Sequence, residues 1–268
     1  MQLHLGWGLR SRVRRARPHV AAARMAVERH TLATVGHRRE RPGGRILCYH
    51  SVGQHAVWGV NDVGAARFRE QLERALGAGY RFVDATSIAV GGGGRKELAL
   101  TFDDCPRSVL TTAAPILAEY GLPFSLFVVS DWSEGTAGPG DEAVLSWDDV
   151  VHVAELGGEI GNHSATHPDF ATIGAGEAAD EIGRASELIE RRTGIAATSF
   201  AIPFGQSGNW PEHAARAAQE LGYDVVYAQG EETRPPGTVA RSFVTTFDRP
   251  RIWDALLEGR YDRWEEWF

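Results

Sequence analysis

The chain has 268 residues, of which 43% are hydrophobic, and a formal net charge of −7 at pH 7. This length fits one large α/β domain, and the composition is that of a globular protein with a core. Two cysteines are too few for a disulfide scaffold, and the single lysine, Lys96, lies in a GGGGRKE segment that does not match a phosphate-binding loop. These features argue against a P-loop nucleotidase.

The N-terminal segment differs from the rest of the chain in charge. Residues 1–45 contain eleven arginines against Glu28 and Glu40, so a net charge of +9 here leaves −16 for the remainder. We expect residues 1–44 to form a mobile or loosely docked basic extension; the alternative is a basic amphipathic segment on an anionic membrane surface or a partner. Because arginines interrupt every apolar run, neither a secretory signal nor a transmembrane helix is predicted, and the default expectation is a cytoplasmic protein that does not bind nucleic acid.

From residue 45 onward, short apolar runs alternate with helix-like segments, which is typical of βα repetition. Helices are predicted at 65–78, 107–120, 146–156, 176–192, 211–221 and 250–257, with Ser146 as a cap and glycines 79, 121, 157, 194 and 222 as stops. Strands are predicted at 46–52, 80–83, 98–104, 124–129, 159–163, 199–204, 224–228 and 239–244. Seven or eight strands with helices between them favour one α/β barrel of parallel strands over two domains.

Polar groups stand at the ends of several predicted strands. In parallel barrels the reactive side chains gather at the carboxyl ends of the strands, where the loops begin. The groups found there are His50, Asp103 with Asp104, His163, and the turn at residues 203–205.

Two histidines four residues apart, His163 and His167, are candidates for binding one ion. A single helical turn would place both imidazoles on one face, and Pro168 would end that turn. One carboxylate of the Asp103–Asp104 pair would complete a set of three ligands with open positions, as catalytic Zn²⁺ and Fe²⁺ sites require, and the other would be free to act as a base. The alternatives are a solvated turn or helix cap for the aspartates and a structural role for the histidines.

Three motifs in order resemble those of the polysaccharide deacetylase family, also called the NodB-homology or carbohydrate esterase family 4 enzymes. They are TFDD at 101–104, HSATHPD at 163–169 and FAIPFG at 200–205, and ILCYHSV at 46–52 is similar to the opening of the bacterial exopolysaccharide-deacetylase branch. The likeness covers residues 45–250. It implies a single distorted (β/α) barrel of seven or eight parallel strands, with a NodB-like catalytic domain over residues 45–268.

The resemblance also implies site residues and a cofactor. A divalent metal, most often zinc, with cobalt, nickel or manganese as alternatives, would be held by Asp104, His163 and His167. Asp103 would be the general base that takes a proton from water, and the backbone near Pro203 and Phe204 would stabilise the tetrahedral oxyanion. Trp132 and Trp210, in loop-like sequence, are the tryptophans expected to line a cleft for the sugar.

The family usually places an arginine that orients the base at the position of Ala201. Arg241 or Arg251 would have to replace it, and a structural salt bridge is the alternative for either. The family also uses a late histidine as the general acid, yet His213 is the last histidine in the chain. We therefore take His50 as the candidate acid, with a buried structural histidine as the alternative.

Cys105 occupies the position after the aspartate pair where the family normally has glycine. We expect the cysteine to be tolerated there with a negative φ, and the alternatives are a soft metal ligand or an oxidation-sensitive thiol.

The sequence thus predicts a metal-dependent hydrolase that removes N-acetyl groups from an N-acetylated sugar or polysaccharide. One alternative is a deacylase or deformylase of a small cytoplasmic N-acyl metabolite. Another is a degenerate homologue that binds carbohydrate without hydrolysing it. The basic N-terminal segment adds the expectation of a peripheral contact with the inner membrane surface.

Overall fold

A closed barrel of seven parallel strands forms the centre of the computed structural model, which describes residues 7–38, 42–53, 56–140 and 143–265, and side chains of the first helix from residue 20 onward. The strand order is β1-β10-β9-β8-β7-β6-β5, and β5 pairs back onto β1 to close the ring. The strands are β1 (Arg45–Tyr49), β5 (Glu97–Phe102), β6 (Phe124–Val128), β7 (Gly158–Asn162), β8 (Ser199–Ala201), β9 (Val225–Gln229) and β10 (Val239–Phe243). The predicted NodB-like (β/α) barrel is therefore confirmed.

Three short strands lie outside this ring. β4 (Arg81–Phe82) pairs with the start of β5, while β2 (Ser51–Val52) and β3 (Asp62–Val63) form a separate small sheet. The barrel strands are almost wholly buried because helices cover their outer faces, which is why they read as continuous apolar runs in the sequence. The barrel interior is filled by side chains that include Ile46, Ala99, Phe127, Ala201 and Tyr227.

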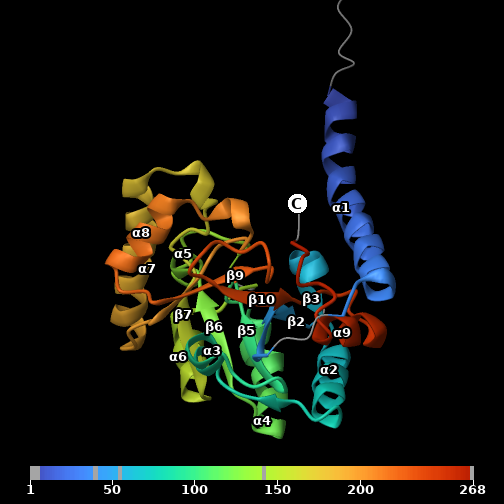
Figure 1. Cartoon of the computed structure of the whole chain (residues 1–268). Coiled ribbons are helices and arrows are strands. Elements are labelled where there is room, and N and C mark those ends of the chain that lie inside the picture. Colours follow the sequence, from blue (N-terminus) through green and yellow to red (C-terminus); the bar gives the residue numbers. More distant parts are fainter. Residues whose placement is uncertain (1–6, 39–41, 54–55, 141–142, 266–268) are drawn as a thin grey trace, which may run out of the picture.

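Helices surround the barrel on its outer face (Figure 1). Ser146 caps α6 in a capping box with Asp149, and Gly121 and Gly194 end their helices in the left-handed conformation, as predicted. The helices are α1 (Trp7–Val35), α2 (Ala65–Gly77), α3 (Ala85–Gly91), α4 (Ala114–Tyr120), α5 (Ser130–Ser133), α6 (Trp147–Glu155), α7 (Ala175–Thr193), α8 (Glu212–Glu220) and α9 (Pro250–Leu257), with short turns η1 (Ala56–Asn61), η2 (Val109–Ala113), η3 (Phe170–Thr172) and η4 (Ser207–Asn209).

The last turns of α1 are packed against the body, beside α9. Met25, Arg29 and Ala33 are buried, and the Arg29 guanidinium donates to both carboxylate oxygens of Asp248, at 2.6 and 2.5 Å, and to the carbonyl of Phe243 at 3.2 Å. The expectation of a mobile or loosely docked extension is therefore wrong for residues 20–35, because a buried ion pair fixes this part of the helix. No helix in the described part of the chain is long and apolar enough to cross a membrane.

Candidate active site

A cavity of about 200 Å³ opens at the carboxyl ends of the barrel strands. Its wall is assembled from residues that follow or end six of the seven barrel strands, together with Asn61 at the end of η1. The lining residues are Cys48, His50, Asn61, Asp103, Asp104, His163, His167, Phe204, Gly205, Gln229, Arg241 and Phe243. The barrel thus brings together the polar groups that the sequence places at strand ends.

Asp104, His163 and His167 converge in this cavity. The Nε2 atoms of both histidines lie 3.3 Å from Oδ1 of Asp104, and one ligand atom from each residue lies within 4.8 Å of the others. His163 Nδ1 lies 2.8 Å from the carbonyl of Ala201 and donates to it, so Nε2 is the nitrogen that faces Asp104. Burial lowers the pKa of His167 to about 4, which leaves its imidazole neutral at pH 7.

These three residues fit a divalent cation. The Oδ1 atom of Asp104 is buried and accepts no hydrogen bond from the described residues, which is unfavourable unless a cation satisfies it. Burial alone would raise the pKa of Asp104, but its interactions with the imidazoles of His167, His163 and His50 outweigh this and hold it well below its ordinary value. An ionised carboxylate beside two imidazole nitrogens is a donor set that zinc prefers.

The turn that carries the two histidines is not helical, so the prediction of a single helical turn is wrong. Ser164 and His167 have φ values of 68° and 64°, and the turn is held by side chains instead. Asn162 Oδ1 accepts from the Ser164 N–H at 2.8 Å, and Ser164 Oγ accepts from the His167 N–H at 3.0 Å. Glu181 of α7 accepts from the Thr166 N–H at 2.8 Å and from its hydroxyl at 3.0 Å.

In the part of the chain that the structure describes, left-handed backbone outside glycine is confined to the loops of this site. Among the described residues, the non-glycine residues with positive φ are Asp104 (68°), Cys105 (40°), Ser164 (68°), His167 (64°) and Phe204 (64°). Such conformations are strained for residues with a Cβ and occur where surrounding contacts enforce them. The turn at Asp104 lets two adjacent aspartates face one cavity, although successive side chains on a strand point in opposite directions.

Asp103 is held by a bidentate ion pair with Arg241. The guanidinium donates to Oδ1 and to Oδ2, each at 2.6 Å, and the Cys48 thiol lies 3.4 Å from Oδ2. Burial would raise the pKa of Asp103, but the charges of Arg241 and His163 and the hydrogen bonds from Arg241 leave it below its ordinary value. Asp103 is therefore ionised at neutral pH and fixed in orientation.

Arg241 rather than Arg251 pairs with the candidate base, because Arg251 is exposed on α9. We expect Arg241→Met to lower kcat by about 10- to 100-fold with little change in KM, since Asp103 loses the donors that orient it. Arg251→Met is the matched control and should leave kcat unchanged. Steady-state kinetics on both variants, with circular dichroism to verify folding, test this expectation; equal kcat values for the two variants would refute it.

His50 lies beside Asp104 in the wall of the same cavity. Its Nε2 is 3.7 Å from Oδ2 of Asp104, and its ring packs edge-on against Phe243 with the centroids 5.3 Å apart. Its Nδ1 is buried and has no hydrogen-bond partner among the described residues. Burial lowers the pKa of His50, so the imidazole is neutral at pH 7.

The two predicted substrate-contacting aromatic residues occupy different environments. Phe204 is 42% exposed, lines the cavity, and packs its ring against His167 at 4.7 Å. Its backbone N–H donates to no acceptor in the described part of the chain. Trp210 instead lies in the core, stacked on Phe200 at 5.3 Å, so the expectation that it contacts substrate is wrong. Pro203 is buried and does not belong to the cavity wall.

Trp132 lies beside the histidine pair. Its ring centroid is 5.5 Å from that of His167, with the two planes inclined at 33°. The side chain is half-buried and does not form part of the cavity wall itself.

Cys105 has a backbone conformation that differs from the expected negative φ. Its φ is positive, and its side chain is fully buried, with the thiol 3.9 Å from the carbonyl of Val129 and the Ser133 hydroxyl 3.6 Å from its sulfur. Burial raises its pKa to about 12, so the thiol is protonated, and Cys105 does not belong to the group of residues that could hold a metal.

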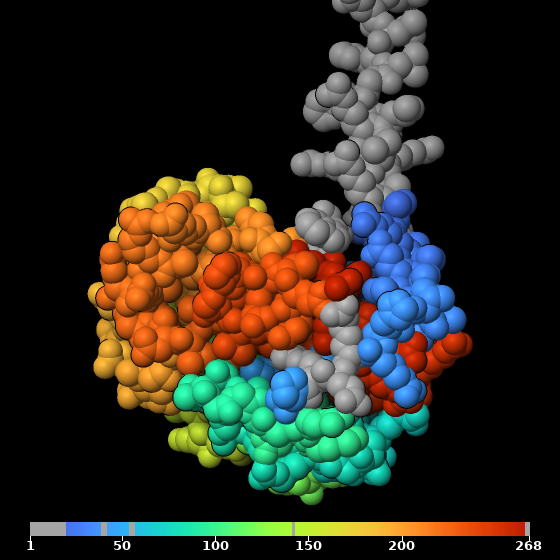
Figure 2. Space-filling view, in the orientation of Figure 1, coloured from blue at the N-terminus to red at the C-terminus, as the bar shows by residue number. Residues whose placement is uncertain are grey.

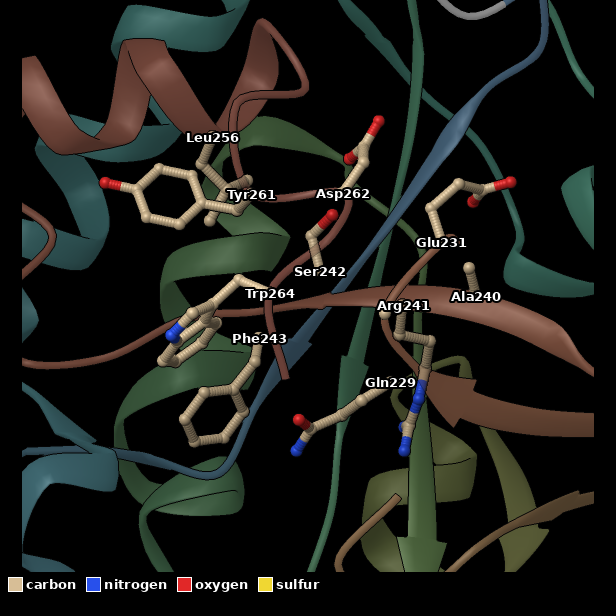
Figure 3. Close-up of a pocket in the computed structure, with 11 residues that line it drawn as sticks. Gln229, Glu231, Ala240, Arg241, Ser242, Phe243, Leu256, Tyr261, Asp262 and Trp264 are labelled. Atoms are coloured by element: carbon tan, nitrogen blue, oxygen red, sulfur yellow. The ribbon is translucent and has the colours of Figure 1, made fainter. Parts of the chain in front are cut away.

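A second, much smaller cavity lies on the other side of Arg241. It measures about 10 Å³, roughly the space of one water molecule, and Figure 3 shows Gln229 and Arg241 extending away from Glu231 and Asp262 in its wall. Gln229, Arg241 and Phe243 border both cavities. Gln229 also fixes the turn at Phe204, because its Nε2 donates to the Phe204 carbonyl at 3.0 Å.

A family model described as polysaccharide deacetylase matches residues 91–226, just over half of the chain. The chain belongs to the polysaccharide deacetylase family. Two similar curated members are a chitooligosaccharide deacetylase of Sinorhizobium fredii, 29% identical over 38% of this chain and 44% of the relative, and a peptidoglycan-N-acetylglucosamine deacetylase of Bacillus cereus, 27% identical over 47% and 43%. This polysaccharide deacetylase family member thus matches less than half the length of either relative.

Solved structures with the same fold include IcaB from Ammonifex degensii, with a TM-score of 0.68 and 23% identity over 82% of this chain and 98% of that one. The Streptococcus pyogenes deacetylase PplD in complex with acetate gives a TM-score of 0.64 and 20% identity over 75% and 92%. At these identities the likeness shows that the polysaccharide deacetylase barrel is shared.

Proposed function

We propose that this chain is a metal-dependent hydrolase that removes N-acetyl groups from an N-acetylated sugar or polysaccharide. One observation carries the proposal: three metal-compatible ligands, Asp104, His163 and His167, share a cavity with a separate carboxylate, Asp103, that is ionised and oriented by Arg241. Family membership and relatives that are named as deacetylases of chitooligosaccharide and of peptidoglycan N-acetylglucosamine support this substrate class.

The proposed reaction uses the residues of the cavity in sequence. A divalent cation on Asp104, His163 and His167 would supply Lewis acidity that activates water and the amide carbonyl at neutral pH. Asp103 takes the proton from the attacking water, and the Arg241 pair keeps its carboxylate aimed while it does so. Its lowered pKa keeps it in the basic form at neutral pH, with Arg241 as its counter-ion.

The remaining steps need a hydrogen-bond donor for the oxyanion and a proton for the leaving nitrogen. We assign stabilisation of the oxyanion to the backbone N–H of Phe204, which has no acceptor among the described residues, since preorganised backbone donors stabilise developing negative charge. We assign the second role to His50, the histidine of the cavity wall that does not belong to the proposed ligand set. Because His50 is neutral, it first takes the proton that Asp103 removed from water and then gives it to the leaving nitrogen, which releases a free amine alongside acetate.

Metal removal tests the proposal most directly. We expect the purified chain to release acetate from tri-N-acetylchitotriose, a chelator followed by dialysis to lower that rate at least about 100-fold, and zinc to restore it. Acetate release that survives complete metal removal would contradict the proposal. Release from small N-acyl compounds but not from the sugar would instead identify a metabolite deacylase, and bound metal without any release would identify a carbohydrate-binding homologue.

A further inference from the structure

Helix α1 presents a row of exposed valines on the face that turns away from the body. Val20, Val27 and Val35 are 65%, 66% and 67% exposed, and their spacing places them on one side of the helix. The opposite side carries Met25 and Arg29, which are buried against the body. Figures 1 and 2 show this helix at one edge of the molecule, and the exposed fractions of the three valines show that no other described element covers them.

The same helix belongs to a segment of strong positive charge. The first acidic residue of the chain is Glu28, and six arginines precede it: Arg10, Arg12, Arg14, Arg15, Arg17 and Arg24. Arg24 is described, and its side chain is 59% exposed beside the valine row, in a surface ion pair with Glu28. The remainder of the chain after residue 45 has a net charge of −16, so the charge of the two parts is sharply separated.

We propose that the exposed face of α1 binds the surface of a bilayer that contains anionic lipids. Arginines supply attraction to lipid headgroups, and the valine row supplies apolar surface that the headgroup boundary can take up. A nucleic acid would match the arginines but would leave the valines in water. A second copy of α1 would match the valines but would bring two arginine-rich segments together, which repel each other.

This mode of binding is peripheral, because no described helix can cross a membrane. The helix would be fixed relative to the barrel, since the ion pair of Arg29 with Asp248 joins its last turns to the loop after β10. The catalytic barrel would therefore be held at a fixed orientation to the lipid surface. The proposal does not depend on the activity assigned to the cavity, and its test uses no substrate.

The experiment measures flotation of the full chain with vesicles of phosphatidylcholine alone and of phosphatidylcholine with about one-third phosphatidylglycerol. We expect a partition coefficient at least about 100-fold higher on the anionic vesicles, falling as salt is raised. We expect the partition coefficient on anionic vesicles to fall about fivefold per arginine in the triple variant Arg10→Gln, Arg12→Gln, Arg14→Gln. It should fall at least about tenfold in the double variant Val20→Asp, Val27→Asp. The matched control is Val90→Asp on α3, where Val90 is 76% exposed, and it should bind like the parent chain.

Four binding results would overturn the proposal. They are no binding to anionic vesicles, equal binding to both kinds of vesicle, unchanged binding by the Val20→Asp, Val27→Asp variant, and tighter binding of duplex DNA than of anionic vesicles. A dimer that forms without lipid and is abolished by the valine variant would also overturn it, by assigning the valine row to a second copy. Because the substituted valines are exposed, thermal melting of the variants should match the parent, which excludes unfolding as the cause of lost binding.

Discussion

Replacing Asp103 by asparagine is expected to lower kcat for acetate release by about 10²- to 10⁴-fold, which is the range that a positioned general base contributes. Asparagine has nearly the shape of aspartate and keeps an acceptor for Arg241, but it cannot take a proton from water. The effect should fall on kcat rather than KM, because Asp103 is buried and would act in the chemical step.

Metal content separates this effect from simple loss of the cation. The Asp103→Asn variant should bind the same amount of zinc as the parent chain, since Asp103 does not belong to the ligand group. The matched control is Asp148→Asn on α6, an exposed carboxylate of the same size that should leave kcat unchanged. Full turnover by Asp103→Asn would remove this residue as the base.

The largest effect on stability is expected at Arg29. The side chains of Arg29 and Asp248 are both 0% exposed, and the guanidinium also packs on the rings of Tyr261 and Trp264, with centroids at 4.8 and 5.0 Å. Arg29→Met should lower the free energy of unfolding by about 3–5 kcal/mol, because it leaves the Asp248 carboxylate buried without its counter-charge. Urea denaturation followed by circular dichroism measures this change.

The control for Arg29 lies on the same helix. Arg24 pairs with Glu28 at the surface, where the side chains are 59% and 33% exposed, so Arg24→Met should cost less than about 0.5 kcal/mol. A similar small change for Arg29→Met would show that α1 is dispensable to the barrel. A large loss would show that residues 20–35 belong to the folding unit, so that a boundary at residue 44 would cut through it.

The strands were predictable because a barrel strand buried on both faces leaves an apolar run that turn residues bound. Each of the eight predicted strand segments contains a strand, and the order of the barrel follows from their alternation with helices. The end of β8 was less predictable. Residues 202–204 are apolar like the strand before them, yet they leave the ladder to form the left-handed turn at Phe204.

That Asp104, His163 and His167 lie together could be predicted from the sequence, but the backbone conformation that brings them together could not. A spacing of four between His163 and His167 fits a helical turn, and only side-chain partners far along the chain, such as Glu181, produce the left-handed turn instead. The burial of Arg29 could not be predicted for the same reason. One buried arginine among many exposed ones has no local signature, and its partner Asp248 lies 219 residues away.

The choice between Arg241 and Arg251 likewise depended on the barrel. Arg241 comes from β10, which reaches β5 only across β1 in the closed ring, so its contact with Asp103 is set by strand order rather than by sequence distance. The position of Trp210 could not be predicted from its local sequence either. Its segment reads as a loop, but the η4 turn folds back over β8 and places the indole against Phe200 in the core.

The left-handed loop residues affect which part of the molecule unfolds first. Each such residue stores on the order of 1 kcal/mol of strain, and five of them together approach the net stability of an ordinary domain. The pairing of β1 with β5 closes the barrel from whose strand ends these loops extend. We therefore expect the loops around Asp104, His167 and Phe204 to relax before the barrel strands under heat or denaturant, and a bound ion, which would stabilise only the folded form of these loops, to raise the unfolding temperature.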